Sequence, residues 1–124
     1  MCGIAGFYGS KLPTRNNIIK SSKLIRHRGP DASGTIVLKK DKLVLIHRRL
    51  SIIDLDQRSN QPMEYENTIL IFNGEIYNYI EIKKKLISMG HTFKTNSDTE
   101  VLIHALKQWK EKAVDFLEGM WAFA

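Results

Sequence analysis

Met1-Cys2-Gly3-Ile4-Ala5-Gly6-Phe7-Tyr8-Gly9 opens the chain and places its one cysteine directly behind the first methionine. Small and apolar residues dominate from Gly3 to Tyr8, and the glycines allow close backbone approach, so we expect a tightly packed strand. Removal of Met1 would leave a thiol and a free α-amine on Cys2. Because the usual pKa values of these groups are about 8.5 and about 8, a proton passes between them easily near neutral pH. Cys2 is therefore either a nucleophile that carries its own base or a small buried residue.

The composition is typical of one globular domain. The 124 residues are 43% hydrophobic and 26% charged, which allows a buried core. One cysteine cannot form an internal disulfide, and no apolar run could span a bilayer. Met1 is followed by neither a basic region nor a long apolar one. We therefore expect a cytoplasmic protein without a membrane partner. The net charge of +6 suggests nucleic acid, but the lysines are dispersed or lie in the run Lys83 to Lys85, which favours a solvated surface.

The residues after this first strand predict a helix, a loop and a hairpin. Isoleucines at helical spacing predict a short helix over 18–28. Pro30 disfavours its continuation, so His27 to Asp31 is expected to be a fixed loop beside the nucleophile and a structural clamp more than a source of catalytic groups. The β-rich runs 35–38 and 43–47 predict the two strands of a hairpin.

The middle of the chain holds a segment without clear periodicity. The residues from Arg48 to Met63 are long for a loop and only partly apolar, and long ordered loops tend to carry function. Thr68 to Phe72 then predicts a buried strand that runs into the turn Asn73-Gly74-Glu75. This turn would present an amide, a bare backbone and a carboxylate to a ligand at the end of the strand.

Two further helices are predicted in the last third. Apolar spacing predicts a helix over 79–89, which Gly90 would end, and a short strand over 91–94. Ser97-Asp98-Thr99-Glu100 has the capping-box pattern and begins a helix whose apolar stripe reaches Trp109.

The final residues, 119–124, form an apolar strand without a polar tail. Because a natural domain seldom ends in a bare hydrophobic strand, we expect the chain to be a fragment.

Several motifs follow one another in a fixed order: Cys2 to Gly6, His27 to Asp31, His47 to Asp54, Phe72 to Asn78, Ser97 to Glu100 and Gly119 to Ala124. Together they resemble the glutaminase domain of glutamine-hydrolysing asparagine synthetase. Sister families such as glucosamine-6-phosphate synthase share the opening Cys-Gly-Ile, but the form Phe-Asn-Gly-Glu-Ile-Tyr-Asn is more similar to the asparagine synthetase branch. The resemblance implies a class II glutamine amidotransferase, an N-terminal-nucleophile hydrolase with an α+β fold arranged as a four-layer αββα sandwich.

The resemblance also implies how glutamine would be hydrolysed. Cys2 would attack the side-chain amide, its α-amine would handle the proton, and water would resolve the γ-glutamyl thioester. Asn73 and the backbone N–H of Gly74 would form the oxyanion hole. Because the amine of Cys2 must be free, an uncleaved Met1 should abolish activity.

Glutamine would be recognised by groups that match its charges. Arg49 would hold the α-carboxylate with its planar fork, and Glu75 and Asp98 would contact the amino end. Each has an ordinary alternative, since Arg49 could be a surface residue, Asp98 could serve only the helix dipole, and Asn73-Gly74 could be a hairpin turn. The expected glutamine-binding residues are Arg49, Leu50, Ser51, Ile52, Ile53, Asn73, Gly74, Glu75 and Asp98.

No cofactor is implied for the glutaminase reaction, and the four histidines make no metal-ligand pattern, so we expect no metal. ATP and Mg would serve only a synthetase domain, which is normally fused in cis and whose Ser-Gly-Gly-x-Asp-Ser loop does not occur in these residues. Residues 1–124 would then be an incomplete glutamine amidotransferase type 2 domain, open on one side because further strands follow in the family. Assembly as a homodimer is one option.

Two other classes of function stay open. The chain could be a non-catalytic fragment or interaction module that needs a partner chain to complete its fold, or a nucleic-acid-binding domain. The acceptor of the ammonia is also open among aspartate, a sugar and a peptide.

Overall fold

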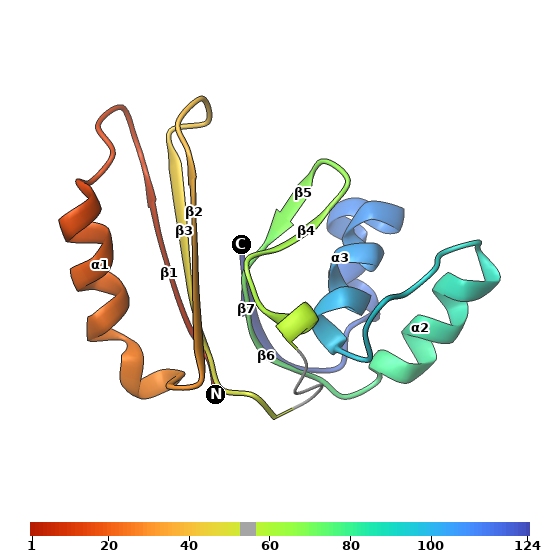
Figure 1. Ribbon diagram of the computed structural model, residues 1–124. Coiled ribbons are helices and arrows are strands. Elements are labelled where there is room, and N and C mark those ends of the chain that lie inside the picture. The colour runs from red at the N-terminus through yellow and green to blue at the C-terminus, as the bar shows by residue number, and fades with distance from the viewer. Residues whose placement is uncertain (53–56) are drawn as a thin grey trace.

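Two β layers lie between two helical layers in the computed structural model, which describes residues 1–52 and 57–124 (Figure 1). This arrangement confirms the expected αββα sandwich. The described elements, with η for a 3-10 helix, are β1 (Gly3–Tyr8), α1 (Arg15–Leu24), η1 (Arg26–Arg28), β2 (Ala32–Leu38), β3 (Leu43–Arg49), η2 (Gln57–Ser59), β4 (Met63–Tyr65), β5 (Thr68–Leu70), β6 (Phe72–Ile76), α2 (Tyr79–Ser88), α3 (Asp98–Trp109), η3 (Lys110–Phe116) and β7 (Gly119–Phe123).

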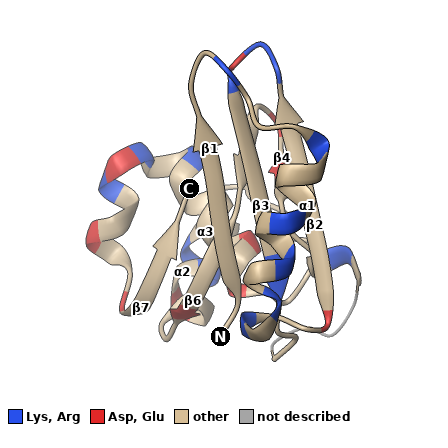
Figure 2. Cartoon of the chain, turned by 90° about the vertical axis from the view of Figure 1, so that its left-hand side faces the viewer, with Lys and Arg blue, Asp and Glu red and all other residues tan. Residues whose placement is uncertain are grey.

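The first sheet is antiparallel in the order β1-β3-β2. Its register pairs Gly3 with Arg48, so Cys2 lies just beyond the strand, beside the end of β3. Helix α1 covers the outer face and buries Ile18 against Val44 and Ile46. Figure 2 looks onto this side and shows lysines and arginines on α1 and at the turn between β2 and β3.

The second β layer pairs β6 with β7 and β4 with β5, in each case antiparallel. Helices α2 and α3 cover it (Figure 1). Leu70, Phe72 and Ile76 pack with Val101 and Leu102 in one buried cluster. Residues 98–105 of α3 are all buried, so this part of the helix is enclosed on several faces and not along a single stripe.

The structure corrects the predicted turn at Asn73-Gly74-Glu75, because these three residues lie within β6. They are paired in register with β7, with Gly74 opposite Trp121. The Asn-Gly pair is a turn signal only when no partner strand competes for its backbone groups. Here β7 supplies that partner from the far end of the chain, so the alternative of an ordinary hairpin turn is wrong.

Other boundaries differ from the prediction in smaller ways. Helix α1 begins at Arg15 because Thr14 caps it by accepting a hydrogen bond from the N–H of Asn17 at 3.3 Å. The predicted strand over 91–94 is absent, and this segment is irregular. Ser97 caps α3 as expected, accepting from the N–H of Glu100 at 3.2 Å. The strands β1, β2, β3 and β7 confirm the predicted ones, with β2 starting three residues earlier.

A bilayer span would require a helix longer and more apolar than any in residues 1–52 and 57–124.

Candidate active site

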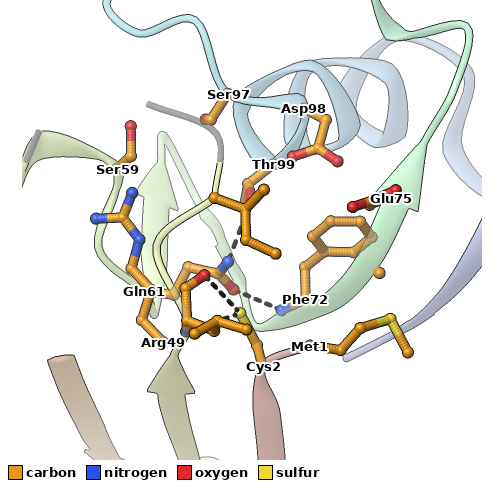
Figure 3. A pocket seen from close by; sticks show the side chains of 13 residues that line it. Met1, Cys2, Arg49, Ser59, Gln61, Phe72, Glu75, Ser97, Asp98 and Thr99 are labelled. Carbon is orange, nitrogen blue, oxygen red and sulfur yellow. Dashed lines mark hydrogen bonds between the residues drawn. The ribbon is translucent and has the colours of Figure 1, made fainter. Parts of the chain in front are cut away.

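A pocket opens between the two β layers beside the N-terminal end of β1 (Figure 3). It receives residues from β3 and the segment after it, from η2, from β6 and from the start of α3. Its lining residues are Met1, Cys2, Arg49, Leu50, Ile52, Ser59, Gln61, Phe72, Gly74, Glu75, Ser97, Asp98 and Thr99. Sequence stretches far apart in the chain therefore meet where the only cysteine lies.

Cys2 is half-buried and is held by the end of β3. Its Sγ donates to the carbonyl oxygen of Leu50 at 3.6 Å and accepts from the N–H of the same residue at 3.4 Å. The loop His27 to Asp31 lies beside it as expected, since Nε of Arg28 donates to the carbonyl oxygen of Cys2 at 3.3 Å. The thiol therefore has a defined place, held through its sulfur by the backbone of Leu50.

The side chain of Met1 lines the pocket (Figure 3). While Met1 is attached, the α-amine belongs to Met1 and the nitrogen of Cys2 is an amide. Since an amide nitrogen cannot serve as a base near neutral pH, Cys2 would have an amine of its own only after Met1 is removed.

Arg49 is the last residue of β3, and its side chain is buried. Its Nη1 donates to Oδ1 of Asn60 at 2.8 Å. Burial of a guanidinium is costly unless it is paired or hydrogen-bonded, so a surface role for Arg49 is excluded. A buried fork of donors at a pocket wall is suited to a carboxylate.

Asp98 and Glu75 bring two carboxylates to the opposite wall. Oδ2 of Asp98 accepts from the N–H of Ile76 at 3.2 Å, which ties the start of α3 to the end of β6. Burial raises the pKa of Asp98, and hydrogen bonds from backbone N–H groups oppose that rise while the charge of Glu75 adds to it. Two neighbouring carboxylates at a partly dry wall favour a positively charged ligand group.

Asn73 and Gly74 lie side by side on β6, but only Gly74 lines the pocket. A Cβ at Gly74 would overlap the carbonyl oxygen of Met120 on β7, so the pairing of the two strands requires glycine. Oδ1 of Asn73 is buried and has no hydrogen-bond partner among the residues that the structure describes. A buried acceptor without a hydrogen bond destabilises the folded protein unless a ligand or a water molecule donates to it.

The segment after Arg49 is divided between the pocket and its support. Leu50 and Ile52 line the pocket. The N–H of Ser51 donates to Oδ2 of Asp31 at 2.8 Å, so this residue is held to the loop and does not line the pocket. Ile53 lies outside the described residues.

Sequence reasoning assigned no site role to Ser59, Gln61, Phe72, Ser97 or Thr99, although Phe72, Ser97 and Thr99 stand in the motifs of the family resemblance. All five line the pocket. The stretch from Arg48 to Met63, which has no clear periodicity, was expected to carry function, and it contains two of these residues, Ser59 and Gln61. No local pattern marks which of its residues face inward, because that depends on the strands against which the segment packs.

His47 joins the two β layers behind the pocket. It is fully buried on β3, and its Nε2 donates to the carbonyl oxygen of Phe72 on β6 at 3.2 Å. Burial lowers the pKa of His47 to about 4; the hydrogen bond to Phe72 opposes this and the charge of Arg49 adds to it. The ring is therefore neutral near pH 7 and is packed in the interior of the protein.

Residues 1–124 match the family model of the glutamine amidotransferase domain. The chain is 42% identical to asparagine synthetase [glutamine-hydrolyzing] 1 of Bacillus subtilis, with 99% of this chain and 20% of that protein covered. It is 41% identical to asparagine synthetase [glutamine-hydrolyzing] of Zea mays, with 99% and 21% covered. The chain thus spans about a fifth of the length of these curated relatives.

A solved structure of glutamine phosphoribosylpyrophosphate amidotransferase from B. subtilis, complexed with ADP and GMP, has the same fold. Its TM-score is 0.75 at 23% identity, with 97% of this chain and 34% of that chain covered. The family model, which matches the whole chain, shows that the chain belongs to the glutamine amidotransferase domain family, and within that family it is similar to glutamine-hydrolysing asparagine synthetases.

Proposed function

We propose that this protein hydrolyses glutamine to glutamate and ammonia, with Cys2 as the nucleophile once Met1 has been removed. The observation that carries the proposal is the pocket itself, in which a thiol, a buried arginine and two carboxylates meet from separate parts of the chain. Membership of the glutamine amidotransferase family supports the same reaction.

The chemistry begins with transfer of the thiol proton of Cys2 to its α-amine. The sulfur then attacks the side-chain carbonyl carbon of glutamine, and the oxyanion that forms is stabilised by the N–H of Gly74 and the side-chain amide of Asn73. The amine returns its proton to the leaving nitrogen, the C–N bond breaks and ammonia departs. A water molecule attacks the thioester, gives up its proton to the amine, and releases glutamate and the thiol.

Substrate selection follows from the charges of the two pocket walls. Arg49 would take the α-carboxylate of glutamine, and Asp98 with Glu75 would take its ammonium. Because burial and Glu75 raise the pKa of Asp98, a bound ammonium would favour the charged form of that carboxylate.

Met1 must be removed for two reasons. Its peptide bond occupies the amine of Cys2, and its side chain lies in the pocket (Figure 3). We therefore expect the protein with Met1 to be an inactive precursor.

The test compares one preparation before and after treatment with methionine aminopeptidase, with removal of Met1 measured by mass spectrometry and ammonia by a coupled assay. Ammonia release from glutamine should begin with the loss of Met1. The Cys2→Ala variant, treated in the same way, is the control and should stay inactive. A folded, fully processed protein that releases no ammonia would contradict the proposal and favour a non-catalytic module.

In the relatives, a domain of this kind is part of a longer protein. If this chain belongs to such a protein, we propose that the ammonia passes to a synthetase domain in cis. Aspartate would be the acceptor, and ATP with Mg would be the cofactors of that domain. The names of the relatives and the fifth of their length that this chain spans support this. We propose that the glutaminase step needs no metal or cofactor, that it takes place in the cytoplasm, and that neither nucleic acid nor a membrane takes part. We also propose that the protein assembles as a homodimer.

A further inference from the structure

Gln61 lies at the pocket wall between the two segments that carry the proposed substrate-binding groups (Figure 3). Its side chain makes two hydrogen bonds. Oε1 accepts from the N–H of Phe72 at 2.6 Å, and Nε2 donates to Oγ1 of Thr99 at 3.2 Å. Gln61 and Thr99 are both buried, so both bonds are shielded from water.

The two partners of Gln61 are direct neighbours of proposed functional residues. Phe72 precedes Asn73 on β6, and Thr99 follows Asp98 on α3. One carboxamide therefore fixes the spacing between the strand of the proposed oxyanion groups and the helix of the proposed ammonium site. A carboxamide offers an acceptor and a donor on one rigid plane, which an apolar side chain of the same length does not.

A second hydrogen bond links β6 to α3 at the other end of the strand. The N–H of Ile76 donates to Oδ2 of Asp98 at 3.2 Å. The stretch Asn73-Gly74-Glu75 is thus bracketed by two bonds that both lead to the first turn of α3, one through Gln61 and one directly. Loss of the Gln61 bonds would leave the strand hydrogen-bonded to the first turn of the helix at one end only.

The backbone of Gln61 is fixed on the opposite β layer. A Cβ at Gly34, on β2, would overlap the carbonyl oxygen of Gln61, so the two backbones are in direct contact. Gln61 therefore connects three parts of the site: the first sheet, beside which Cys2 lies, the strand β6 and the helix α3.

We propose that Gln61 is a positioning residue, whose carboxamide holds β6 and the start of α3 at the spacing that places the glutamine side chain against Cys2. This inference rests on the proposed glutaminase function. Gln61 touches neither reacting atom, so its effect is on geometry. Displacement of a substrate-positioning group by about 1 Å can cost about 100-fold in rate.

The main test is Gln61→Met, which keeps length and removes both hydrogen bonds. We expect kcat/KM for glutamine to fall by about 10- to 100-fold, with most of the loss in kcat. The matched control is Gln57→Met, the same change at an exposed position of η2, which should leave kcat/KM within about twofold. An unchanged kcat/KM in Gln61→Met would overturn the inference.

A second measurement separates positioning from general loosening. Alkylation of Cys2 by 6-diazo-5-oxo-norleucine requires a seated glutamine shape, whereas alkylation by iodoacetamide does not. In Gln61→Met the first rate should fall by at least tenfold, and the second should stay within about twofold of the parent protein. Equal changes in both rates would show a general structural role and overturn the inference.

Hydrogen exchange provides a readout that does not depend on turnover. The amide of Phe72 should lose protection in Gln61→Met and keep it in Gln61→Glu, because a carboxylate still accepts from Phe72 and from the hydroxyl of Thr99. Gln61→Glu should also lose less activity than Gln61→Met. Equal loss of activity in the two variants, with Phe72 protected only in Gln61→Glu, would contradict the inference.

If Gln61→Met does not fold, Thr99→Val removes one of the two bonds and should lower kcat/KM by about three- to tenfold, whereas no change would overturn the inference. Failure of the proposed function is distinct from these outcomes. It would be seen in the processed parent protein as no ammonia release, while failure of the present inference would be seen only as variants that match an active parent.

Discussion

The strands β1 and β6 reach the same pocket from opposite sheets, but they hold their functional groups very differently. Cys2 lies one residue outside β1, is half-buried, and forms sulfur hydrogen bonds with the backbone of Leu50 at 3.4 and 3.6 Å. Asn73, Gly74 and Glu75 lie within β6 and are bracketed by hydrogen bonds at 2.6 and 3.2 Å to buried groups. The nucleophile thus lies partly exposed at the end of a strand, whereas the β6 groups lie inside a strand that is paired along its length.

This difference fits the separate demands on the two sides. A residue that must lose Met1 and then exchange a proton within itself needs access and some freedom. Groups that stabilise a developing charge act best when they need no rearrangement. We therefore expect changes at Cys2 to affect chemistry alone, and changes to the hydrogen bonds that bracket β6 to affect both chemistry and stability.

The largest effect is expected from Cys2→Ala. It should lower glutamine turnover by about 10⁴-fold or more, because no other group on the nucleophile side can replace the thiol. Stability in urea and binding of glutamine, measured by calorimetry, should stay close to those of the parent protein. A clear loss of stability would break the comparison, since it would show that the thiol is part of the fixed frame.

Asn73→Ala should lower kcat by about 100- to 1,000-fold, the usual cost of one oxyanion donor. Because Oδ1 of Asn73 has no partner in the described part of the chain, we expect little loss of stability from this change. Steady-state kinetics and urea unfolding of the same sample check both points. A rise in KM without a fall in kcat would place Asn73 in ground-state binding.

The burial of His47 between the two β layers predicts that the stability of the protein depends on pH. The pKa of buried His47 is lowered from 6.5 to about 4, so the unfolded chain binds a proton that the folded one does not between these values. The free energy of unfolding should therefore be highest above about pH 6.5. It should fall by at most about 3 kcal/mol as the pH falls toward about 4. Urea unfolding at several pH values measures it.

His47→Gln is the matched variant for this prediction, because its amide can still donate to Phe72 but does not titrate. Its stability should fall less than that of the parent protein between pH 6.5 and pH 4. An identical pH profile in the two proteins would show that His47 is not the group responsible.

The smallest effect is expected from Arg49→Lys, which keeps the charge and loses the planar fork. KM for glutamine should rise by about tenfold, with kcat changed less, because one ammonium replaces a bidentate contact. Arg48→Lys is the matched control, since the neighbouring side chain donates to Gly29 and does not line the pocket. An unchanged KM in Arg49→Lys would exclude it as the carboxylate ligand.

Prediction from sequence succeeded where the pattern was local. The strand β1, predicted from its run of small and apolar residues, and the cap at Ser97 are set by neighbouring residues, and both are confirmed. Prediction was wrong at Asn73-Gly74-Glu75, where a local turn signal competed with pairing to β7 across the chain. It also gave no sign of Gln61, because a hydrogen bond between distant segments leaves no periodic trace in either segment.

The sequence by itself determined the family, the αββα class and the residue types that the site needs, because the order of short motifs and the charge of each side chain are properties of the chain alone. Only the tertiary structure decided that Asn73, Gly74 and Glu75 form a strand, that Arg49 is buried, and that Gln61 joins β6 to α3. The physical reason is that strand pairing and burial depend on partners supplied from elsewhere in the chain, so the same residues would have another structure without them.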